Sequence, residues 1–531
     1  MFGIIFLITL LIINLKSTTS LEDSKYWSKS AEQEIKESLS YKWNENIAKN
    51  VIIFIGDGMS IDTITASRIY HKGETNYLGW EKFPHIGLIK TYNTNKKVPD
   101  SASTATALFS GIKTNFNVIG VNVNVELNDC DASLNTSNHV ESIIGWAQKA
   151  GKHTGFVTTT RVTHATPAPL YAHCPNRGWE CENKIPNDSK KCKDIARQLV
   201  EDYPGKNIRV IMGGGRQVLQ SNVTSKEHDP IDTWACYSSD GRDLISDWAN
   251  DKKQQNVNYK IIENNEQLKN IEADKIDYLL GIFANGHMSM DWERQNGPDG
   301  QPSLEEMTTA AIEVLKKSKN GYLLVVEGGL IDFAHHRGHA AQALRETARL
   351  SDAVSKTLKL VDTDETLVIV TSDHSHSMSF NGYADRESSI LGIAMKSKYD
   401  KIPFTTLTYA TGGINNLAYE INIENNKSQR IDPSKSDTTA FNYSQQAAII
   451  TDEALHGGGD VPVYAIGPFG HLLHSTHEQN YVAHVIAYAS KIGPYANSDT
   501  SNFHSFNKNF ILVSILFISI IINKYFFTNF T

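Results

Sequence analysis

The stretch LLVVEGGLIDFAHH begins as an apolar run and ends in side chains that can do chemistry. These side chains are Glu327, Asp332, His335 and His336. Asp332 and His336 are four residues apart, so in a helical turn they share one face and can bind one ion. His with carboxylate oxygen suits Zn²⁺, whereas an oxygen-only set suits Mg²⁺. The alternative for a single His, such as His335, is an ordinary hydrogen-bonded residue.

Two other apolar runs end in acids in the same way. VIIFIG is followed by Asp57, and LVIVTS is followed by Asp373 and His374. An acid after a strand is often the cap of a helix, and this is the alternative for each case taken alone. Three such strand ends, two of them with His close behind, favour a shared site, because ligands bind beyond the carboxyl ends of parallel strands.

The stretch VPDSASTATALFSG supplies a candidate nucleophile. Pro99 and Asp100 interrupt regular structure, and a helix of small residues is expected from Ser101. A serine there meets the free amides and dipole of a helix N-terminus, which favour an anion. The alternative is that Ser101 only caps the helix. Serine attacks poorly unaided, and a metal ion at its oxygen would activate it, so the pattern predicts phosphoryl transfer with an Arg clamp.

The elements that must position these groups alternate along the chain. Strands are expected at NVIIFIG, TGFVTTT, RVIMGGG, YLLVVEGG, TLVIVTSDH and VPVYAIG, with helices at 303–317 and 340–360. This alternation predicts an α/β fold: a doubly wound, largely parallel central sheet with helices on both faces. Residues 379–444, rich in Asn, Lys, Ser and Thr, break the rhythm and are expected to form an inserted surface subdomain.

The composition is that of a large globular enzyme. Of 531 residues, 40% are hydrophobic and 21% charged, which suffices for a large core. The net charge is -8 and no basic cluster suits nucleic acid. Nucleic-acid binding is therefore not expected.

Both ends are expected to be removed from an exported protein. In residues 1–20 an apolar run leads to Lys16, and Thr18 and Ser20 fit the small-residue positions of a signal peptidase site. The alternative is a short membrane anchor. Residues 498–531 have the layout of a GPI attachment signal: small residues, a spacer and an apolar tail. A tail-anchoring helix is the alternative there, and 21–497 would be the catalytic domain.

Cysteines and sequons are consistent with export. The five Cys favour disulfides and leave one thiol unpaired; they are Cys130, Cys174, Cys181, Cys192 and Cys236. Candidate N-glycosylation sites are Asn135, Asn187, Asn222, Asn426 and Asn442.

Taken in order, the motifs resemble those of the metazoan alkaline phosphatases, over roughly 43–495. The matching stretches are IIFIGDGM, VPDSASTATALFSG, VTTTRVTHATPAPLYAHCPNR, VEGG..D..HH, TSDHSHS and HGGGDVPVYAIGP. The resemblance implies hydrolysis of phosphate monoesters at alkaline pH through a phosphoserine, by a GPI-anchored homodimer on the extracellular face of the plasma membrane. It also implies a crown-like insertion, two Zn²⁺ and one Mg²⁺ per subunit.

The resemblance further implies roles for single residues. Ser101 would be the nucleophile, and Arg177 would clamp two phosphate oxygens. One zinc would be held by Asp332, His336 and His456. The second would be held by Asp57, Asp373 and His374, with Ser101 alongside. Magnesium would be held by Asp57, Thr166 and Glu327. His164 and His376 would lie just outside these ligands.

Several positions depart from the family pattern. The resemblance implies a disulfide between Cys130 and Cys192, but the family's C-terminal disulfide is absent. Cys174 and Cys181 could then pair locally and leave Cys236 free, but the pairing of these three cysteines stays open. Ala284 replaces the Glu that follows Phe in members with a fourth, calcium-type site, so no Ca²⁺ is expected.

Leu330 and Phe333 stand where vertebrate members have Arg and His. Phe333 lies beside the expected zinc ligand Asp332, and a phenyl ring cannot replace the hydrogen bonds of an imidazole. We expect weaker retention of inorganic phosphate. The alternative is that Phe333 turns away and packs against Leu330.

Other functions of the same superfamily fit these residues less well than a monoesterase does. A phosphodiesterase typically lacks the magnesium ligands and the Arg clamp, so Thr166, Glu327 and Arg177 favour a monoesterase. A sulfatase needs a formylglycine precursor in its own context, which PDSAS does not offer. An inactive GPI-anchored binding protein would not need every ligand. The sequence does not identify the alcohol part of the substrate, because such a site binds mainly the phosphate group.

Overall fold

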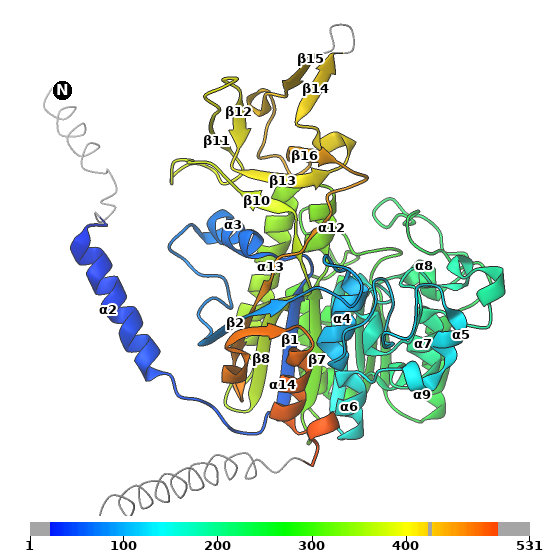
Figure 1. Ribbon diagram of the computed structural model, residues 1–531. Helices are drawn as coiled ribbons and strands as arrows, with labels where there is room; N and C mark the ends of the chain where they lie inside the picture. The colour runs from blue at the N-terminus through cyan, green and yellow to red at the C-terminus, as the bar shows by residue number, and fades with distance from the viewer. Residues whose placement is uncertain (1–21, 423–426, 498–531) are drawn as a thin grey trace, which may run out of the picture. The chain divides into compact units, whose positions relative to one another are not determined.

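A ten-stranded sheet forms the centre of the part of the chain that begins at Asn44 (Figure 1). Its strands, in spatial order, are β19 (Ser475–Glu478), β2 (His85–Lys90), β18 (Val461–Ile466), β8 (Thr366–Ser372), β1 (Asn50–Gly56), β7 (Tyr322–Gly328), β3 (His153–Arg161), β4 (Val210–Gly214), β6 (Tyr278–Ile282) and β5 (Tyr259–Ile262). From β8 to β5 all neighbours are parallel, whereas β18 is antiparallel to both β8 and β2. The computed structural model describes residues 22–422 and 427–497.

The register of the central strands aligns their carboxyl ends. Gly56 of β1 pairs with Gly328 of β7 on one side and with Ser372 of β8 on the other. All residues of the three strands are buried, as expected for parallel strands covered on both faces. The residues that follow these strands therefore emerge together at one edge of the sheet.

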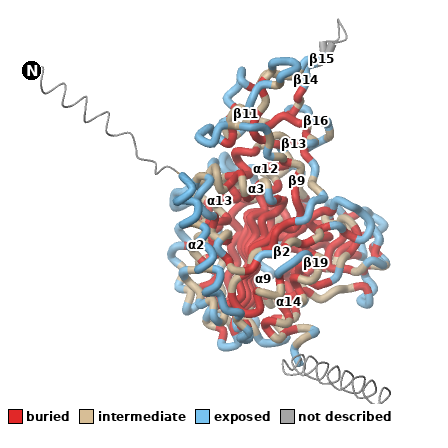
Figure 2. Tube along the Cα trace, turned by 60° about the vertical axis from the view of Figure 1, so that its left-hand side comes forward, coloured by how far each residue is buried: buried red, intermediate tan, exposed pale blue. Residues whose placement is uncertain are grey.

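Helices cover both faces of the sheet, and alternate residues of β1 face two different cores. Ile53 and Ile55 belong to a core with α4 (Ser101–Ser110), α6 (Ile143–Lys149), α7 (Ile195–Glu201), α9 (Leu244–Gln254) and α14 (Tyr481–Ser490). Ile52 and Phe54 belong to the other core, with α3 (Ile61–Lys72), α11 (Leu304–Leu315), α12 (Leu330–His336) and α13 (Ala340–Thr357). In Figure 2 buried residues gather in the interior and exposed ones lie towards the outside.

The part of the chain between β8 and β18 contains only short strands. They are β9 (Ser375–His376), β10 (Met378–Phe380), β11 (Ile393–Lys396), β12 (Pro403–Thr405), β13 (Leu407–Gly412), β14 (Tyr419–Asn422), β15 (Lys427–Arg430), β16 (Ala447–Ile450) and β17 (His456–Gly457). They form small sheets apart from the central one, and most lie together at one end of the sheet in Figure 1. The segment expected to be inserted, 379–444, falls within this region.

The predicted doubly wound, largely parallel sheet is confirmed. Each of the six expected strands is present, and the helices expected at 303–317 and 340–360 are α11 and α13. Four short strands of the central sheet, β2, β5, β6 and β19, were not predicted. The antiparallel orientation of β18 was not predicted either, because the composition of an apolar strand does not indicate its direction.

The chain before Asn44 forms a separate unit. It contains α2 (Ser24–Ser40), which Asp23 caps by accepting a hydrogen bond from the amide of Tyr26 at 2.9 Å. None of its residues is buried. Across residues 22–422 and 427–497, no helix is long and apolar enough to cross a membrane. The expected signal peptide, the expected GPI signal and Asn426 lie outside the described residues.

The structure has two disulfides. Cys130 and Cys192 are bonded, as the resemblance implied, with 5.9 Å between their Cα atoms. Of the three cysteines left open by the sequence, Cys181 pairs with Cys236, and Cys174 is buried as a free thiol. The local pair of Cys174 and Cys181 does not form, because the fold brings the distant Cys236 to Cys181; the Cys174 thiol instead donates a hydrogen bond to the carbonyl of Asn176 at 3.2 Å.

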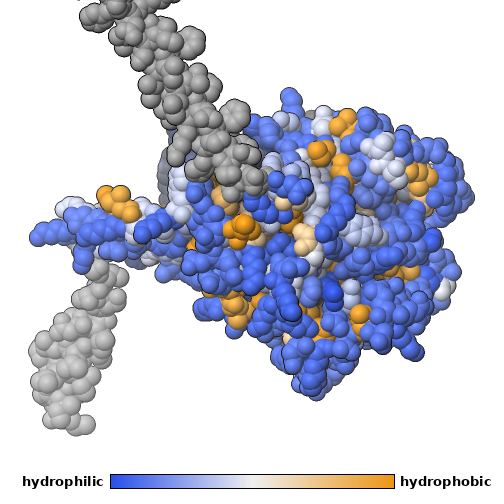
Figure 3. All heavy atoms as spheres, turned by 90° about the horizontal axis from the view of Figure 1, so that it is seen from below, coloured by the Kyte–Doolittle hydropathy of each residue, from blue (hydrophilic) through white to orange (hydrophobic). Residues whose placement is uncertain are grey.

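The face shown in Figure 3 is mainly polar, with hydrophobic side chains scattered among hydrophilic ones, as is normal for the surface of a globular protein. The expected glycosylation sites in the described chain, Asn135, Asn187, Asn222 and Asn442, are all exposed.

Candidate active site

Three acids meet beyond the carboxyl ends of the central strands. Asp57 follows β1, Glu327 is near the end of β7, and Asp373 follows β8. All three are buried. Because β1 lies between β7 and β8, Asp57 is the central one, and its amide donates a hydrogen bond to the carbonyl of Gly328 at 3.3 Å.

Three groups of side chains bring possible metal ligands within 4.8 Å of one another. The first group is Asp332, His336, His376 and His456; the second is Asp57, Asp373 and His374; the third is Asp57, His164 and Glu327. Asp57 belongs to two groups, so the groups adjoin. The structure thus brings together most of the ligands expected from the sequence, and it draws His164 and His376 in with them.

The first group is built on one turn of α12 and on the short pair of β9 and β17. The Oδ2 of Asp332 lies 3.0 Å from the Nε2 of His336, four residues later. The Nε2 of His456 lies 3.1 Å from the same nitrogen. Backbone carbonyls hold the opposite nitrogens: Ala454 accepts from His336 Nδ1 at 2.8 Å, and Pro99 accepts from His456 Nδ1 at 2.9 Å. Both rings therefore present Nε2 lone pairs to one point, as metal-binding imidazoles do.

Gly58 makes room for this group. Its φ is +66°, and a Cβ there would lie 2.8 Å from the Oδ1 of Asp332. A residue with a side chain would be strained and would crowd that oxygen, so glycine suits the position.

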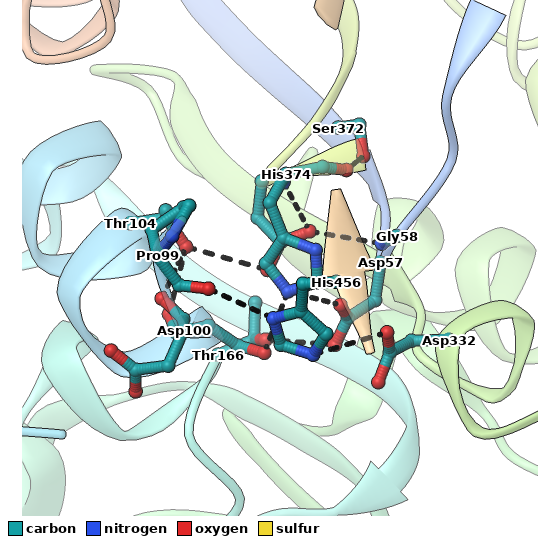
Figure 4. A network of polar contacts seen from close by, with 12 residues as sticks. Asp57, Gly58, Pro99, Asp100, Thr104, Thr166, Asp332, Ser372, His374 and His456 are labelled. Carbon is teal, nitrogen blue, oxygen red and sulfur yellow. Dashed lines mark hydrogen bonds and ion pairs between the residues drawn. The ribbon is translucent and has the colours of Figure 1, made fainter. Parts of the chain in front are cut away.

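The second group surrounds the hydroxyl of Ser101. The Oγ of Ser101 lies 3.3 Å from the Nε2 of His374. The same nitrogen lies 3.5 Å from the Oδ1 of Asp57 and 3.3 Å from the Oδ2 of Asp373. The rings of His374 and His456 are stacked, 3.6 Å between centroids, so the first two groups are in direct contact (Figure 4).

The third group surrounds Glu327. Its Oε2 accepts hydrogen bonds from Thr158 and, at 3.2 Å, from Thr160. Thr166 donates to the Oδ2 of Asp57 at 3.4 Å. The remaining oxygen, Oε1 of Glu327, has no hydrogen-bond partner among the residues that the structure describes. The group is rich in oxygen ligands, which suits a hard cation such as Mg²⁺.

The buried atoms of these groups fit bound cations. Asp57 Oδ1, Glu327 Oε1, Asp332 Oδ1 and His376 Nε2 are all buried without a hydrogen-bond partner in the described chain. Burial and the nearby acids raise the pKa of Asp57 well above its usual value, and burial raises the pKa of Glu327 to about 7. Buried ionised carboxylates are costly unless they are paired or coordinate metals. The residues therefore fit metal ions.

Ser101 is not the cap of its helix. Asp100 is the N-cap of α4, and its carboxylate accepts from the amides of Ala102 at 3.0 Å and Ser103 at 3.4 Å. The alternative that Ser101 serves only as a cap is thus wrong. Its hydroxyl is directed at the second group of ligands, and it is 1% exposed.

Arg177 lies at the same site. Its Nη1 donates to the Oδ2 of Asp100 at 3.2 Å, and its Nη2 lies 3.3 Å from the Nε2 of His164. It lines a cleft of about 1200 Å³ together with Asp332 and His336. The cleft gives the buried groups access to solvent and leaves room for more than a phosphate group.

His335 is the hydrogen-bonded residue that the sequence allowed as an alternative. Its ring lies between the hydroxyls of Thr63 at 3.0 Å and Tyr409 at 2.7 Å. Burial lowers its pKa to about 3, so the imidazole is neutral.

Phe333 and Leu330 take different positions. Leu330 is buried in the core, whereas Phe333 is partly buried and lines the cleft. The guanidinium of Arg337 lies over the ring of Phe333, 4.0 Å from its centroid, and His287 lies beside it at 5.2 Å. Phe333 therefore faces the cleft with Arg337 and His287 as its neighbours.

Sequence reasoning missed the residues that support the ligands. Thr158 and Thr160 hold Glu327, and Asp100 holds both the helix and Arg177. The run of threonines at the end of TGFVTTT was a usable signal, because strand β3 runs parallel to β7 and ends at the same edge.

Comparisons with known proteins agree with this geometry. The family model for alkaline phosphatase matches residues 48–492. The tissue-nonspecific alkaline phosphatase of Homo sapiens is 42% identical over 483 residues, 89% of each chain. A membrane-bound alkaline phosphatase of Bombyx mori is 37% identical over 485 residues, 89% of this chain and 86% of the relative.

Solved structures support the fold. The alkaline phosphatase from the Antarctic bacterium TAB5 aligns with a TM-score of 0.56 and 24% identity, over 85% of this chain and 99% of that one. The family model covers most of the chain, and the relatives are similar over nearly all of it. The chain therefore belongs to the alkaline phosphatase family and is a metal-dependent hydrolase of that family.

Proposed function

We propose that the protein hydrolyses phosphate monoesters at alkaline pH through a phosphoserine on Ser101. The observation that carries the proposal is the position of Ser101: its hydroxyl lies 3.3 Å from His374 Nε2, among buried ligands and at the N-terminus of α4. An anion is favoured at such a helix N-terminus.

The metals we assign follow from the ligand types. Zn²⁺ suits the first group, in which Asp332, His336 and His456 converge, and also the second group of Asp57, Asp373 and His374. Mg²⁺ suits the oxygen ligands Asp57, Thr166 and Glu327. When bound, such ions supply positive charge that stabilises the phosphate oxygens and lowers the pKa of a hydroxyl or water.

The chain's own residues act in two steps, formation and hydrolysis of the phosphoserine. The Ser101 oxygen loses its proton and attacks phosphorus, and the bond from phosphorus to the alcohol oxygen breaks as the alcohol leaves with a proton. Water hydrolyses the phosphoserine and restores the Ser101 hydroxyl. Arg177 donates two hydrogen bonds to phosphate oxygens, while its bond to the Oδ2 of Asp100 holds the guanidinium in place.

A monoesterase is favoured over a phosphodiesterase of the same superfamily. Thr158 and Thr160 orient Glu327, and Asp100 orients Arg177, so both the third ligand group and the clamp have dedicated supports. A diester has one fewer charged oxygen for that clamp. Retention of this machinery also argues against an inactive binding protein.

We also propose a GPI-anchored, glycosylated homodimer on the extracellular face of the plasma membrane. The apolar C-terminal tail and the four exposed sequons support this proposal, as does the name of the membrane-bound relative from Bombyx mori. A GPI-specific phospholipase should release the protein from membranes. Release by detergent alone would favour a spanning tail instead.

One assay tests the proposed activity. Release of an aryl alcohol should be fast from a phosphate monoester and much slower from the matched diester, and a chelator should abolish it. Rapid diester hydrolysis would assign the protein to the diesterases, and no hydrolysis of either with Zn²⁺ and Mg²⁺ supplied would favour a binding protein.

A further inference from the structure

A continuous row of side chains connects the expected phosphate clamp to a second guanidinium. Arg177 Nη2 lies 3.3 Å from His164 Nε2, and the rings of His164 and His287 are 5.0 Å apart. His287 and Phe333 are 5.2 Å apart, and Arg337 lies 4.0 Å from the Phe333 ring centroid. All five side chains line the cleft of about 1200 Å³. They form one wall of it, which we call the Arg177–Arg337 wall.

The middle of this wall consists of flat rings: the imidazoles of His164 and His287 and the apolar ring of Phe333. The wall therefore offers a guanidinium at each of its two ends and flat rings between them.

In the described part of the chain, Arg337 differs from the other arginines of the cleft because no hydrogen bond or ion pair holds its guanidinium. Arg161 is paired with Glu180 and Asp232, and Arg216 with Asp229. Within residues 22–422 and 427–497 the guanidinium of Arg337 makes neither a hydrogen bond nor an ion pair, and its contact is the face of Phe333. Stacking on a ring holds a guanidinium in place while its N–H groups stay available.

Arg337 lies on the side of the cleft where the leaving group of a substrate would be. It follows His336 directly in the chain, and Phe333 follows Asp332, so both come from the turn that supplies the first ligand group. Three rings separate Arg337 from Arg177 along the wall. When the phosphate group of a substrate is bound at Ser101 and Arg177, Arg337 is therefore available to bind another part of that substrate.

We propose that Arg337 binds a second anionic group, phosphate or carboxylate, on the leaving group of the substrate. The preferred substrates are then phosphate monoesters whose alcohol carries such a group beyond a flat or short spacer, which lies against His287 and Phe333. A planar guanidinium matches both anions through paired hydrogen bonds. This inference rests on the proposed hydrolysis of monoesters at Ser101 and adds a specificity-determining residue to it.

The test compares matched substrates. Meta- and para-carboxyphenyl phosphate are each compared with the neutral carbamoylphenyl phosphate of the same shape, and phenylene bisphosphate is compared with phenyl phosphate. The measured quantity is the ratio of kcat/KM for the anionic substrate to that for its neutral partner. Dividing the wild-type ratio by the variant ratio cancels differences in intrinsic reactivity.

Arg337→Ala should lower this ratio by about tenfold for at least one anionic substrate, the size expected for a charge-assisted hydrogen bond. Activity on phenyl phosphate should stay near the wild-type value, because that substrate has no second anion. Arg337→Lys should restore part of the ratio, and Phe333→Leu should lose part of it. Lys226→Ala is the matched control, since Lys226 is another exposed cation of the cleft, and its ratio should not change.

The outcomes separate the possibilities. A loss confined to the bisphosphate assigns Arg337 to a second phosphate, and a loss with both classes assigns it to anions generally. An unchanged ratio for every pair overturns the proposal. An equal loss in Lys226→Ala also overturns it, because it would show that the positive charge of the cleft as a whole, and not Arg337, attracts the anion. Failure of the proposed function would look different: the wild-type protein would not hydrolyse phenyl phosphate at all.

Discussion

Asp100 joins the nucleophile's helix to the phosphate clamp. Its Oδ2 accepts both the amide of Ala102, in the first turn of α4, and the Nη1 of Arg177 at 3.2 Å. One carboxylate thereby fixes the start of the helix that carries Ser101 and the guanidinium that faces it. This arrangement makes the clamp's geometry depend on a residue that touches no substrate.

Asp100→Asn removes the charge and one of the two acceptor oxygens of this side chain. The remaining oxygen can still cap α4, but the amide nitrogen then faces N–H donors on the other side, so the free energy of unfolding should fall by about 1–2 kcal/mol. Arg177 loses its charged partner and must be ordered when phosphate binds. The inhibition constant of inorganic phosphate should therefore rise about fivefold in the folded variant, from the loss of about 1 kcal/mol. Arg177→Ala should raise it further. An unchanged constant in folded Asp100→Asn would show that Asp100 does not position the clamp.

Metal content should follow the ligand groups. His456→Ala removes an imidazole whose Nε2 faces His336, so zinc content and activity should fall together. His335→Ala is a useful comparison, because His335 is buried nearby but bonded to Thr63 and Tyr409. That variant should lose stability and retain zinc per folded molecule. Elemental analysis of the purified, folded proteins measures both, and normal zinc in His456→Ala would refute the assignment.

Phe333→His should strengthen the retention of inorganic phosphate. An imidazole can hydrogen-bond water near the phosphate, whereas the phenyl ring cannot. A contact through water is worth about 1 kcal/mol, which is several-fold in the inhibition constant. The gain should vary with pH as the new imidazole titrates. Phe333→Leu serves as the control for loss of the ring alone. A phosphate inhibition constant that is the same for Phe and His at every pH would contradict the prediction.

Glu346 should make stability depend on pH. It is a buried residue of α13, and burial raises its pKa from 4.5 to about 7 in the folded chain. A raised pKa means that folding favours the protonated acid, so this contribution is complete below pH 4.5 and is lost as the pH rises through 7.

Relative to Glu346→Gln, the wild-type free energy of unfolding should therefore fall by up to about 3 kcal/mol over that interval. Gln can still accept the hydrogen bond that Asp291 donates through its amide at 2.6 Å. Denaturant unfolding at several pH values measures the difference, with the exposed Glu272→Gln as control. A difference that does not vary with pH would disprove the ionisation of Glu346 as its cause.

The clustering of the candidate ligands could be predicted from the sequence better than the residues that support them. Asp57, Glu327 and Asp373 could be assigned to one site because each ends a strand that is apolar throughout, and such strands are parallel and adjacent. The supporting residues Thr158, Thr160 and Asp100 were missed, because a threonine in a strand or an acid before a helix is common without such a role.

Contacts between distant segments were the least predictable. The pairing of Cys181 with Cys236 depends on how the loops after β3 and β4 meet, and spacing favoured the nearer Cys174. The stacking of Arg337 on Phe333 likewise depends on side-chain rotamers on α12, which a sequence pattern does not specify.

Identification of the phosphorylated residue tests the central claim most directly. The protein is mixed with a phosphate monoester, quenched in acid, digested and analysed by mass spectrometry. We predict phosphate on Ser101 of the wild-type protein and of Ser103→Ala, the neighbouring serine of the same helix. Ser101→Ala should carry no phosphate and lose most of its turnover while keeping its bound metal. Phosphate on another residue, or full turnover in Ser101→Ala, would contradict the account.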